Sequence, residues 1–326
     1  MRPEVIEGDV REVLKTLDDE SVQCVVTSPP YWGLRDYGSE GQLGLEETPE
    51  EYVENMVSVF QEIKRVLRKD GTVWLNLGDS YAGGGRAGKN TEYKEKHTNF
   101  GRVQDMSTYA DPSKIPKGLK AKDLVGIPWR VAFALQSDGW YLRSDIIWNK
   151  PNPMPESCKD RPTKSHEYIF LLTKSAKYYY DADAIRVPLS EVSKQFLDVA
   201  NGNPLREVDG FSKEKRYSTG GKLSRAEMGN FVNPKGANKR SVWRITTKPY
   251  KGAHFATFPE ELPETCIKAG TKRGDVVLDI FAGSGTTLRV ASKLGRKGIG
   301  IELNPEYIKI LKKRCKIESM CLEAFA

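Results

Sequence analysis

Thr27-Ser28-Pro29-Pro30-Tyr31-Trp32 is the stretch on which the fold and the function of this chain depend. It directly follows Cys24-Val25-Val26, a short β-branched run that is typical of a buried strand. Two consecutive prolines cannot continue a helix or a strand ladder, so the chain must leave the sheet in a stiff, extended turn. Proteins of the α/β class place their ligand-binding residues in loops at the carboxyl ends of strands. The stretch therefore predicts an α/β fold with a functional loop at 27–32.

The groups in this loop suit the binding of an amino group attached to a ring. Pro29 has no N–H, so its carbonyl is an acceptor in a fixed direction, and the Ser28 hydroxyl lies beside it in sequence. The ring of Tyr31 is placed to stack on the ring that bears the amine. A proline-rich surface turn is the simpler alternative, and the rest of the chain must decide between the two.

Composition limits the class of protein. The chain has 326 residues, 38% of them hydrophobic, which is enough for one large α/β domain with a smaller part or for two domains. No apolar run approaches the roughly 18 residues of a membrane span, and the N-terminus has no secretory apolar core. The five cysteines form no C-x-x-C pair and the three histidines no metal motif. These features favour a reducing cytoplasm, without disulfides and without a metal.

Positive charge is concentrated in two segments. Residues 85–122 carry a net charge of +5 and residues 148–252 one of +9, which leaves about −7 for the remainder of a chain whose total is +7. A basic part on an acidic body is typical of proteins with a polyanionic partner, most simply nucleic acid. Within 185–250, aromatic residues are interleaved with the basic ones, a pattern that suits phosphate contacts and base stacking. An ordinary solvated lysine surface is the alternative.

Hydrophobic periodicity predicts strands alternating with helices. Thr48-Pro49-Glu50-Glu51 is a capping box with proline at the first helical position, and the amphipathic helix that follows is expected to end at Asp70-Gly71. Strands are expected at 5–9, 22–26, 72–77, 141–148, 167–173, 276–280 and 298–302. Further helices are expected at 10–17, 128–137, 286–294 and 305–316.

A glycine loop between the last two expected strands indicates a nucleotide. Phe281-Ala282-Gly283-Ser284-Gly285-Thr286-Thr287 opens a helix, and the next strand ends at Glu302. Glycines let the backbone approach a ligand, and an acid at a strand end suits ribose hydroxyls. Leu288 stands where the dinucleotide fingerprint has its third glycine, which favours an adenosine ligand without phosphates, such as S-adenosylmethionine, over NAD. A tight structural turn is the alternative.

Taken together, these motifs resemble the β class of DNA amino-methyltransferases, which methylate cytosine N4 or adenine N6 with S-adenosylmethionine. The resemblance covers nearly the whole chain. Its mark is the circularly shifted order, with T-S-P-P-Y-W near the N-terminus and F-A-G-S-G-T-T near the C-terminus. It implies a Rossmann-like S-adenosylmethionine-dependent methyltransferase sheet with helices on both faces and a basic target-recognition region.

The resemblance also implies how the chain is divided. The expected parts are a catalytic half of the methyltransferase domain at 1–80, a basic flexible insert at 81–122, a continuation of the catalytic domain at 123–184, a target-recognition region at 185–250 and an S-adenosylmethionine-binding half at 251–326. The implied partner is duplex DNA, and the sequence leaves open whether a cognate restriction endonuclease completes a restriction–modification system. A cytoplasmic protein encoded by a prokaryote or a phage is expected, and the oligomeric state stays open.

Site residues follow from the motifs of the resembled family. The catalytic residues would be Ser28, Pro29, Pro30 and Tyr31. Asp9 would contact the adenine amino group of the cofactor and Glu302 its ribose. The other expected cofactor contacts are Thr27, Phe258, Asp279, Phe281, Gly283, Gly285 and Thr286. The pocket for the target base would be lined by Trp32, Trp148, Lys150 and Asn152.

The expected chemistry starts from an exocyclic amine whose lone pair is delocalised into its ring. Two acceptors, the Ser28 hydroxyl and the Pro29 carbonyl, can pyramidalise that nitrogen, and a flipped-out base can stack on Tyr31. Carbon-5 methylation would need a cysteine after a proline, and the sequence has none. Serine at position 28 favours cytosine N4, since adenine enzymes usually carry Asp or Asn there. Adenine N6 is the nearest alternative, and RNA, a protein amide or an inert DNA-binding protein are more distant ones.

Overall fold

The structure, a computed structural model, describes residues 2–34, 38–82, 115–201, 231–247 and 258–317. Its residues cluster into two compact units, a larger one from Met1–Tyr180 and Ser241–Ala326 and a smaller one from Asp181–Arg240. Most of the expected insert and much of the expected target-recognition region lie outside the described residues, so these divisions stay predictions. No helix in the described ranges is long and apolar enough to cross a bilayer.

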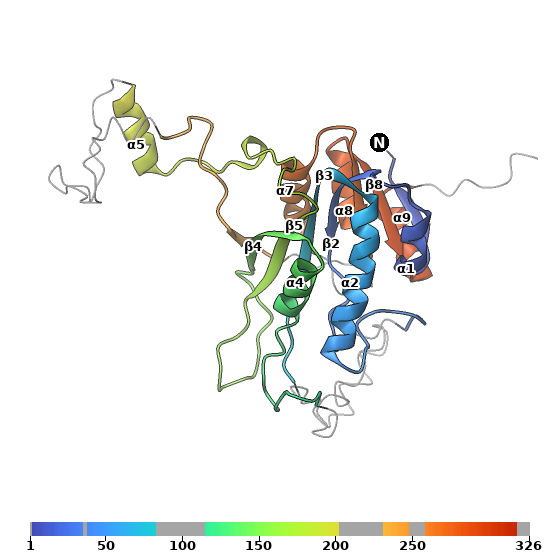
Figure 1. Ribbon diagram of the computed structural model, residues 1–326. Coiled ribbons are helices and arrows are strands. Elements are labelled where there is room, and N and C mark those ends of the chain that lie inside the picture. Colours follow the sequence, from blue (N-terminus) through green and yellow to red (C-terminus); the bar gives the residue numbers. More distant parts are fainter. Residues whose placement is uncertain (1, 35–37, 83–114, 202–230, 248–257, 318–326) are drawn as a thin grey trace, which may run out of the picture. The chain divides into compact units, whose positions relative to one another are not determined.

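The larger unit is built on a β-sheet flanked by helices (Figure 1). The sheet has eight strands in the order β1-β8-β7-β2-β3-β5-β4-β6. Its strands are β1 (Glu4–Glu7), β2 (Val22–Thr27), β3 (Leu67–Leu77), β4 (Tyr141–Asn149), β5 (His166–Thr173), β6 (Val242–Arg244), β7 (Val276–Asp279) and β8 (Lys297–Glu302). The strands from β1 to β3 in this order run parallel, whereas β5 is antiparallel to both β3 and β4. Parallel strands of this kind bring their carboxyl ends to one edge, where α/β proteins bind ligands.

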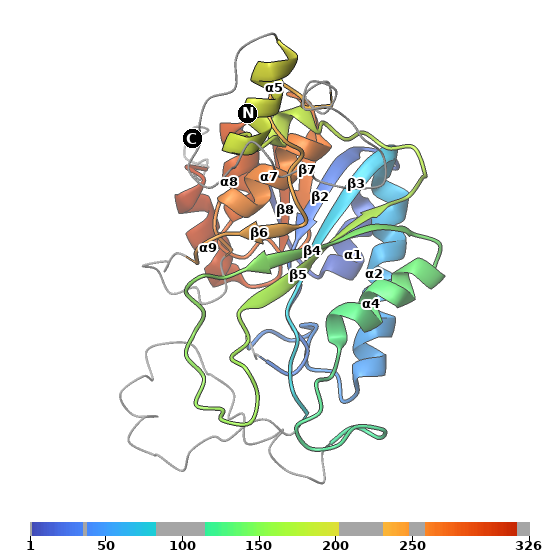
Figure 2. The same ribbon diagram turned by 90° about the vertical axis from the view of Figure 1, so that its left-hand side faces the viewer.

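Helices cover both faces of this sheet, as expected (Figure 2). One face is covered by α1 (Val10–Val13), α2 (Pro49–Val66) and α4 (Ile127–Ser137). The other is covered by α7 (Glu261–Gly270), α8 (Thr286–Lys293) and α9 (Pro305–Arg314). The two layers account for the near-continuous apolar sequence of β2, which is buried along its whole length between them.

Helix α2 shows how local sequence sets these boundaries. The capping box is formed as expected, because Thr48 Oγ1 accepts from the Glu51 backbone N–H at 3.2 Å and the Glu51 carboxylate accepts from the Thr48 backbone N–H. The expected end at Asp70-Gly71 is wrong. The helix ends at Val66, because Leu67 is buried and pairs with Val22 on β2. The polar residues that follow lie in a register shift of the β2–β3 pairing, which resumes at Thr72.

Other differences are small and have local causes. The helix expected at 10–17 is α-helical only to Val13 and continues as a 3-10 turn over Leu14–Thr16. No periodic pattern indicated β6 or α7. Strand β6 is only three residues long and lies at the sheet edge beside β4, inside the basic stretch. The remaining expected strands and helices are present within a few residues of their predicted bounds.

The smaller unit contains α5 (Glu191–Ala200), whose N-cap Ser190 accepts from the Ser193 backbone N–H at 3.2 Å. An isolated antiparallel bridge joins Val187 to Ala237. Arg186 ties the two ends of the unit together, since its Nη1 donates to the Gly236 carbonyl at 2.9 Å. Residues 202–230 lie outside the description, so the expected role of this region in reading DNA is carried forward as a prediction.

Candidate active site

Four neighbouring parallel strands end beside the residues that the motifs singled out. In spatial order, β1 leads to Asp9, β8 ends at Glu302, β7 ends at Asp279 and β2 ends at Thr27. The two motifs lie near opposite ends of the sequence, but they are neighbours in the structure because β7 pairs directly with β2. The candidate site lies at this edge of the sheet.

The loop after β2 is fixed at both ends and in the middle. Thr27 Oγ1 donates to Asp279 Oδ1 at 2.8 Å, and Tyr52 Oη donates to the Pro30 carbonyl at 2.9 Å. Trp32 Nε1 donates to the Glu46 carbonyl at 2.9 Å. These three hydrogen bonds, together with two prolines, hold the loop in one conformation.

Trp32 lies in the hydrophobic core and not in an open pocket. Its side chain is only 3% exposed and packs with the residues under α2. Its place in the target-base pocket stays a prediction, and in this structure its ring is covered by the core and its N–H is bonded. Trp148 is equally buried, and its Nε1 donates to the Ile245 carbonyl at 2.9 Å.

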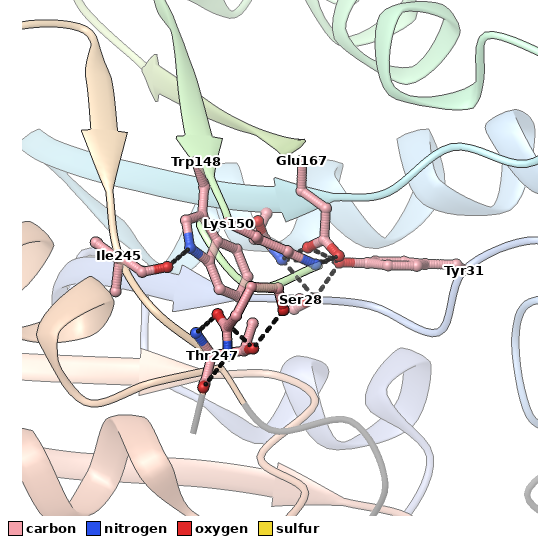
Figure 3. A network of polar contacts seen from close by, with 9 residues as sticks. Ser28, Tyr31, Trp148, Lys150, Glu167, Ile245 and Thr247 are labelled. Atoms are coloured by element: carbon pink, nitrogen blue, oxygen red, sulfur yellow. Dashed lines mark hydrogen bonds and ion pairs between the residues drawn. The ribbon is translucent and has the colours of Figure 1, made fainter. Parts of the chain in front are cut away.

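A polar network joins the loop to β3, β4 and β5 (Figure 3). Glu167 on β5 is its centre: Oε2 accepts from Tyr31 Oη at 2.8 Å and from Asn76 Nδ2 at 2.9 Å. The other oxygen, Oε1, accepts from Lys150, whose ammonium also lies 4.4 Å from the Trp148 ring centre. The pair of Lys150 and Glu167 is largely shielded, with side chains 20% and 16% exposed. A shielded ion pair with its remaining lone pairs satisfied by hydrogen bonds is rigid.

Ser28 is held at the near end of this network. Its hydroxyl donates to Tyr31 Oη at 3.3 Å and accepts from Asn76 Nδ2 at 3.3 Å. A serine hydroxyl has one hydrogen and two lone pairs, so one acceptor position is not taken by any described residue. Ser28 is half-buried and Pro29 beside it is buried. The site thus offers a single, oriented hydroxyl acceptor at the end of a strand.

The Tyr31 ring is positioned from two sides. Its hydroxyl is bonded as above, and Gly78 lies against the ring, since an added Cβ at Gly78 would come within 2.5 Å of Tyr31 Cε2. Burial, with the nearby charge of Glu167, raises the pKa of Tyr31 well above its usual value. The hydroxyl therefore stays protonated and remains a donor to Glu167.

Both carboxylate oxygens of Asp279 accept hydrogen bonds from other groups of the protein. Oδ1 accepts from Thr27 Oγ1 and from the Phe281 backbone N–H at 3.2 Å, and Oδ2 accepts from Thr287 Oγ1 at 2.7 Å. Burial raises the pKa of its carboxyl to about 6, and the hydrogen bonds partly oppose this effect. Through these contacts Asp279 joins β7 and α8 to the loop at 27–32.

Glu302 and Asp9 flank the glycine loop. Glu302 Oε2 accepts from the Gly283 backbone N–H at 2.7 Å and Oε1 from the Asn304 backbone N–H at 2.9 Å, while burial raises the pKa of the carboxyl. Asp9 is the N-cap of α1, and the hydrogen bonds from Arg11, with 3.0 Å between Nε and Oδ1, lower its pKa. Glu302 keeps acceptor capacity beyond these contacts, as ribose donors require, whereas Arg11 donates to both oxygens of Asp9.

The glycine loop is shaped by close packing. Gly285 has a φ of +77°, and an added Cβ would lie 2.7 Å from Leu311 Cγ on α9. Gly283 also has a positive φ, +50°, and it turns its N–H to Glu302. Arg314 on α9 donates to Thr286 Oγ1 at 2.8 Å. The backbone of the loop is thus tightly turned, and its side chains are held by residues of α9. A glycine loop of this shape, whose backbone a ligand can approach closely, fits an adenosine ligand.

The other expected pocket residues have structural partners. Asn152 pairs with Thr247: its Nδ2 donates to the Thr247 carbonyl and its Oδ1 accepts from the Thr247 N–H, both at 3.0 Å. Phe258 is half-buried, and residues 248–257, which directly precede it, lie outside the described residues. Within the part of the chain that is described, no cluster of His, Cys, Asp or Glu is arranged to hold a metal ion.

Sequence reasoning missed Asn76 and Glu167. Each is a polar residue in an otherwise apolar strand, within T-V-W-L-N-L and H-E-Y-I-F-L-L. A buried polar residue in such a run is informative, because it must find a partner. That signal was present in the sequence, but it named no partner.

A family model described as DNA methylase matches residues 22–313. The chain belongs to the DNA methylase family. The expected resemblance is thereby confirmed, and this methyltransferase acts on DNA.

The chain is similar to curated members of known name. It is 47% identical over 310 residues to the Type II methyltransferase M.SmaI of Serratia marcescens, covering 95% of this chain and 89% of that protein. It is 48% identical over 314 residues to M.Cfr9I of Citrobacter freundii, covering 96% and 88%.

Two solved structures share the fold. One is the PvuII DNA methyltransferase (cytosine-N4-specific), with a TM-score of 0.61, 20% identity and coverage of 98% of this chain and 88% of that one. The other is TTHA0409 of Thermus thermophilus, solved with S-adenosyl-L-methionine, with a TM-score of 0.56, 24% identity and coverage of 96% and 93%. At these identities the similarity concerns the fold, and the expected methyltransferase sheet is confirmed.

Proposed function

We propose that this DNA methyltransferase transfers a methyl group from S-adenosylmethionine to N4 of a cytosine flipped out of duplex DNA. The observation that carries the proposal is the Ser28 hydroxyl, which is oriented by Tyr31 and Asn76 and keeps one acceptor position for an amine hydrogen. The Pro29 carbonyl is the second acceptor in the proposed mechanism. Two acceptors on one amine localise its lone pair, and holding the nitrogen in line with the donor supplies much of the rate.

As a member of the DNA methylase family, the chain uses S-adenosylmethionine as its methyl donor, which supplies an electrophilic methyl group. Glu302 would accept from the ribose hydroxyls, Asp9 from the adenine amine, and the Gly283–Gly285 backbone would lie against the ligand. Asp279 would hold this side of the site to the catalytic loop through Thr27. In this proposal, the cofactor would bind at the ends of β1, β8 and β7, and the target base would bind at the end of β2.

The choice of cytosine rests on the neutral hydroxyl. The amine of cytosine lies beside N3, an acceptor that a carboxylate at position 28 would repel. Ser28 instead accepts from the amine and donates away from it, to Tyr31. The name of the PvuII enzyme, which shares the fold, agrees with this choice.

The proposed partners follow from charge and family. The basic segments 85–122 and 185–250 would contact the phosphates of duplex DNA, and the flipped base would stack on Tyr31. The Type II names of the 47% and 48% identical relatives support a cytoplasmic restriction–modification role with a cognate endonuclease.

The test is the product itself. Mixed-sequence DNA methylated by the purified protein would be digested to nucleosides for mass spectrometry and mapped by single-molecule sequencing. N4-methylcytosine at one short sequence is the expected result. N6-methyladenine without N4-methylcytosine would overturn the cytosine proposal and leave the family assignment intact.

A further inference from the structure

A directed chain of hydrogen bonds leads from the catalytic serine into the protein. Ser28 Oγ donates to Tyr31 Oη at 3.3 Å, and Tyr31 Oη donates to Glu167 Oε2 at 2.8 Å. Each atom in the chain is both the acceptor of one hydrogen and the donor of the next until the carboxylate is reached. Such an arrangement can pass a proton by successive short transfers.

Asn76 fixes the direction of this chain. The two hydrogens on its Nδ2 are shared among three acceptors, Ser28 Oγ at 3.3 Å, Tyr31 Oη at 2.8 Å and Glu167 Oε2 at 2.9 Å. Its Oδ1 is buried and has no partner among the described residues. The amide orientation is nevertheless set, because reversing it would turn the carbonyl oxygen toward the carboxylate. Neither hydroxyl donates to this NH₂ group; the Ser28 hydroxyl donates to Tyr31 and the Tyr31 hydroxyl donates to Glu167.

Lys150 lies at the far end of this series of hydrogen bonds, beside Glu167. It is paired with Glu167 Oε1, which leaves Oε2 to the two hydrogen bonds from Tyr31 and Asn76. Lys164, which lies 4.0 Å from Asp79, is a second lysine close to Glu167, whereas desolvation lowers the pKa of His166 and favours its neutral form. Glu167 thus pairs with Lys150 through one oxygen and directs the other toward the loop at 27–32.

We propose that Glu167 is the final acceptor of the proton released on methylation, through Tyr31 and Ser28. This inference rests on the proposed transfer to an exocyclic amine. The nitrogen lone pair forms the new nitrogen–carbon bond as the sulfur–carbon bond of the donor breaks, and the electron pair of that bond stays on sulfur. The surplus proton on nitrogen passes to Ser28 Oγ, the Ser28 proton to Tyr31 Oη, and the Tyr31 proton to Glu167 Oε2. The donor's positive charge and the Glu167 negative charge both disappear, so atoms and charge balance.

A purely structural Glu167, which only holds the Tyr31 ring in place, is the competing explanation. Glu167→Gln separates the two, because an amide oxygen still accepts from Tyr31 and Asn76 but takes no proton at neutral pH. Tyr31→Phe keeps the ring for stacking and removes only the hydroxyl that links Ser28 to Glu167. Both variants have a matched control in Glu264→Gln, which removes the charge of an exposed ion pair on α7.

The experiment measures the rate of methyl transfer in a single turnover, in H₂O and in D₂O, for the wild type, both single variants and the double variant. Each single variant is expected to be slower by roughly 10²-fold, the usual contribution of a proton-accepting group. The double variant should be no slower than the slower single one, because both remove the same path. The wild type should be slower in D₂O, and this isotope effect should vanish in the variants. Affinities for S-adenosylmethionine and DNA should stay unchanged in all of them.

A second readout does not depend on rate. Infrared difference spectra of the wild-type product complex should contain a newly protonated carboxylic acid, which is missing in Glu167→Gln. The relay is overturned if Tyr31→Phe turns over at the wild-type rate, or if the two substitutions slow the enzyme additively. A product of N6-methyladenine would overturn the cytosine proposal alone, because the same rates would still decide the relay.

Discussion

Thr27 Oγ1 lies 2.8 Å from Asp279 Oδ1, although the two residues are 252 positions apart in the chain. The contact joins the end of β2 to the end of β7, the strands that carry the catalytic loop and the glycine loop. It is a buried hydrogen bond that adds to the backbone pairing of β2 with β7 and to the contact of Thr287 Oγ1 with the Val26 carbonyl. In the proposed site, the same sheet edge would position both the acceptors for the amine and the methyl donor.

Ser28→Ala is expected to lower turnover by roughly one to three orders of magnitude, the scale of losing one transition-state hydrogen bond. The loop should keep its conformation, because Asn76 still bonds to Tyr31 and Glu167, and Tyr52 still bonds to Pro30. S-adenosylmethionine affinity by calorimetry should therefore be close to that of the wild type. Wild-type turnover in this variant would remove Ser28 from the mechanism.

Glu302→Ala and Asp9→Ala are expected to weaken S-adenosylmethionine binding by roughly 1.5–3 kcal/mol each, the cost of a donor left without its charged acceptor. Glu302→Ala also frees the Gly283 N–H, so the glycine loop itself should loosen. Glu306→Ala is a matched control, since Glu306 is exposed on α9 and pairs there with the exposed Lys309. Titration calorimetry decides the matter, and wild-type affinity in either site variant would refute that residue's assignment.

The affinity for duplex DNA is expected to fall steeply with salt, with a slope of about −0.9 on logarithmic axes per phosphate contact. The reason is the net charge of +5 on residues 85–122 and +9 on 148–252. Lys117→Gln, in the first of these segments, should reduce the slope by about 1 if that side chain contacts a phosphate. Lys309→Gln, on α9 in the acidic remainder, should leave it unchanged. A flat salt dependence in the wild type would exclude a phosphate-binding role for the basic segments.

The sequence predicted the parts of the site that lie in continuous motifs. The loop at 27–32 and the glycine loop were recognisable because prolines and glycines leave the backbone few choices. Glu167 could not be placed, because its position depends on the pairing of β5 between β3 and β4, with β5 antiparallel to both. Local hydrophobic periodicity predicts that a strand forms, but it does not predict which strands pair with it. For a similar reason the sequence did not show that the Trp32 ring is covered, since only the packing of α2 reveals it.

Asp279 gives a prediction about stability and pH. Burial raises the pKa of its carboxyl from 3.8 to about 6 in the folded protein. Between these values the folded state binds more protons than the unfolded state, so the contribution of Asp279 to the unfolding free energy falls as pH rises from about 4 to 6. A difference of about two pH units corresponds to roughly 3 kcal/mol. Above pH 6 the contribution is constant.

Asp279→Asn removes this titration while keeping an oxygen that accepts from Thr27 and from the Phe281 N–H. Relative to the variant, the wild type is expected to lose up to roughly 3 kcal/mol of unfolding free energy between pH 4 and pH 7. Glu302, whose pKa is also raised by burial, is present in both proteins, but its charge helps to raise the pKa of Asp279, so the difference contains this coupling as well. Urea unfolding of both proteins across this range is the measurement. Parallel curves would mean that the folded protein does not hold Asp279 in its buried, desolvated place, and the link between the two halves of the site would have to be sought elsewhere.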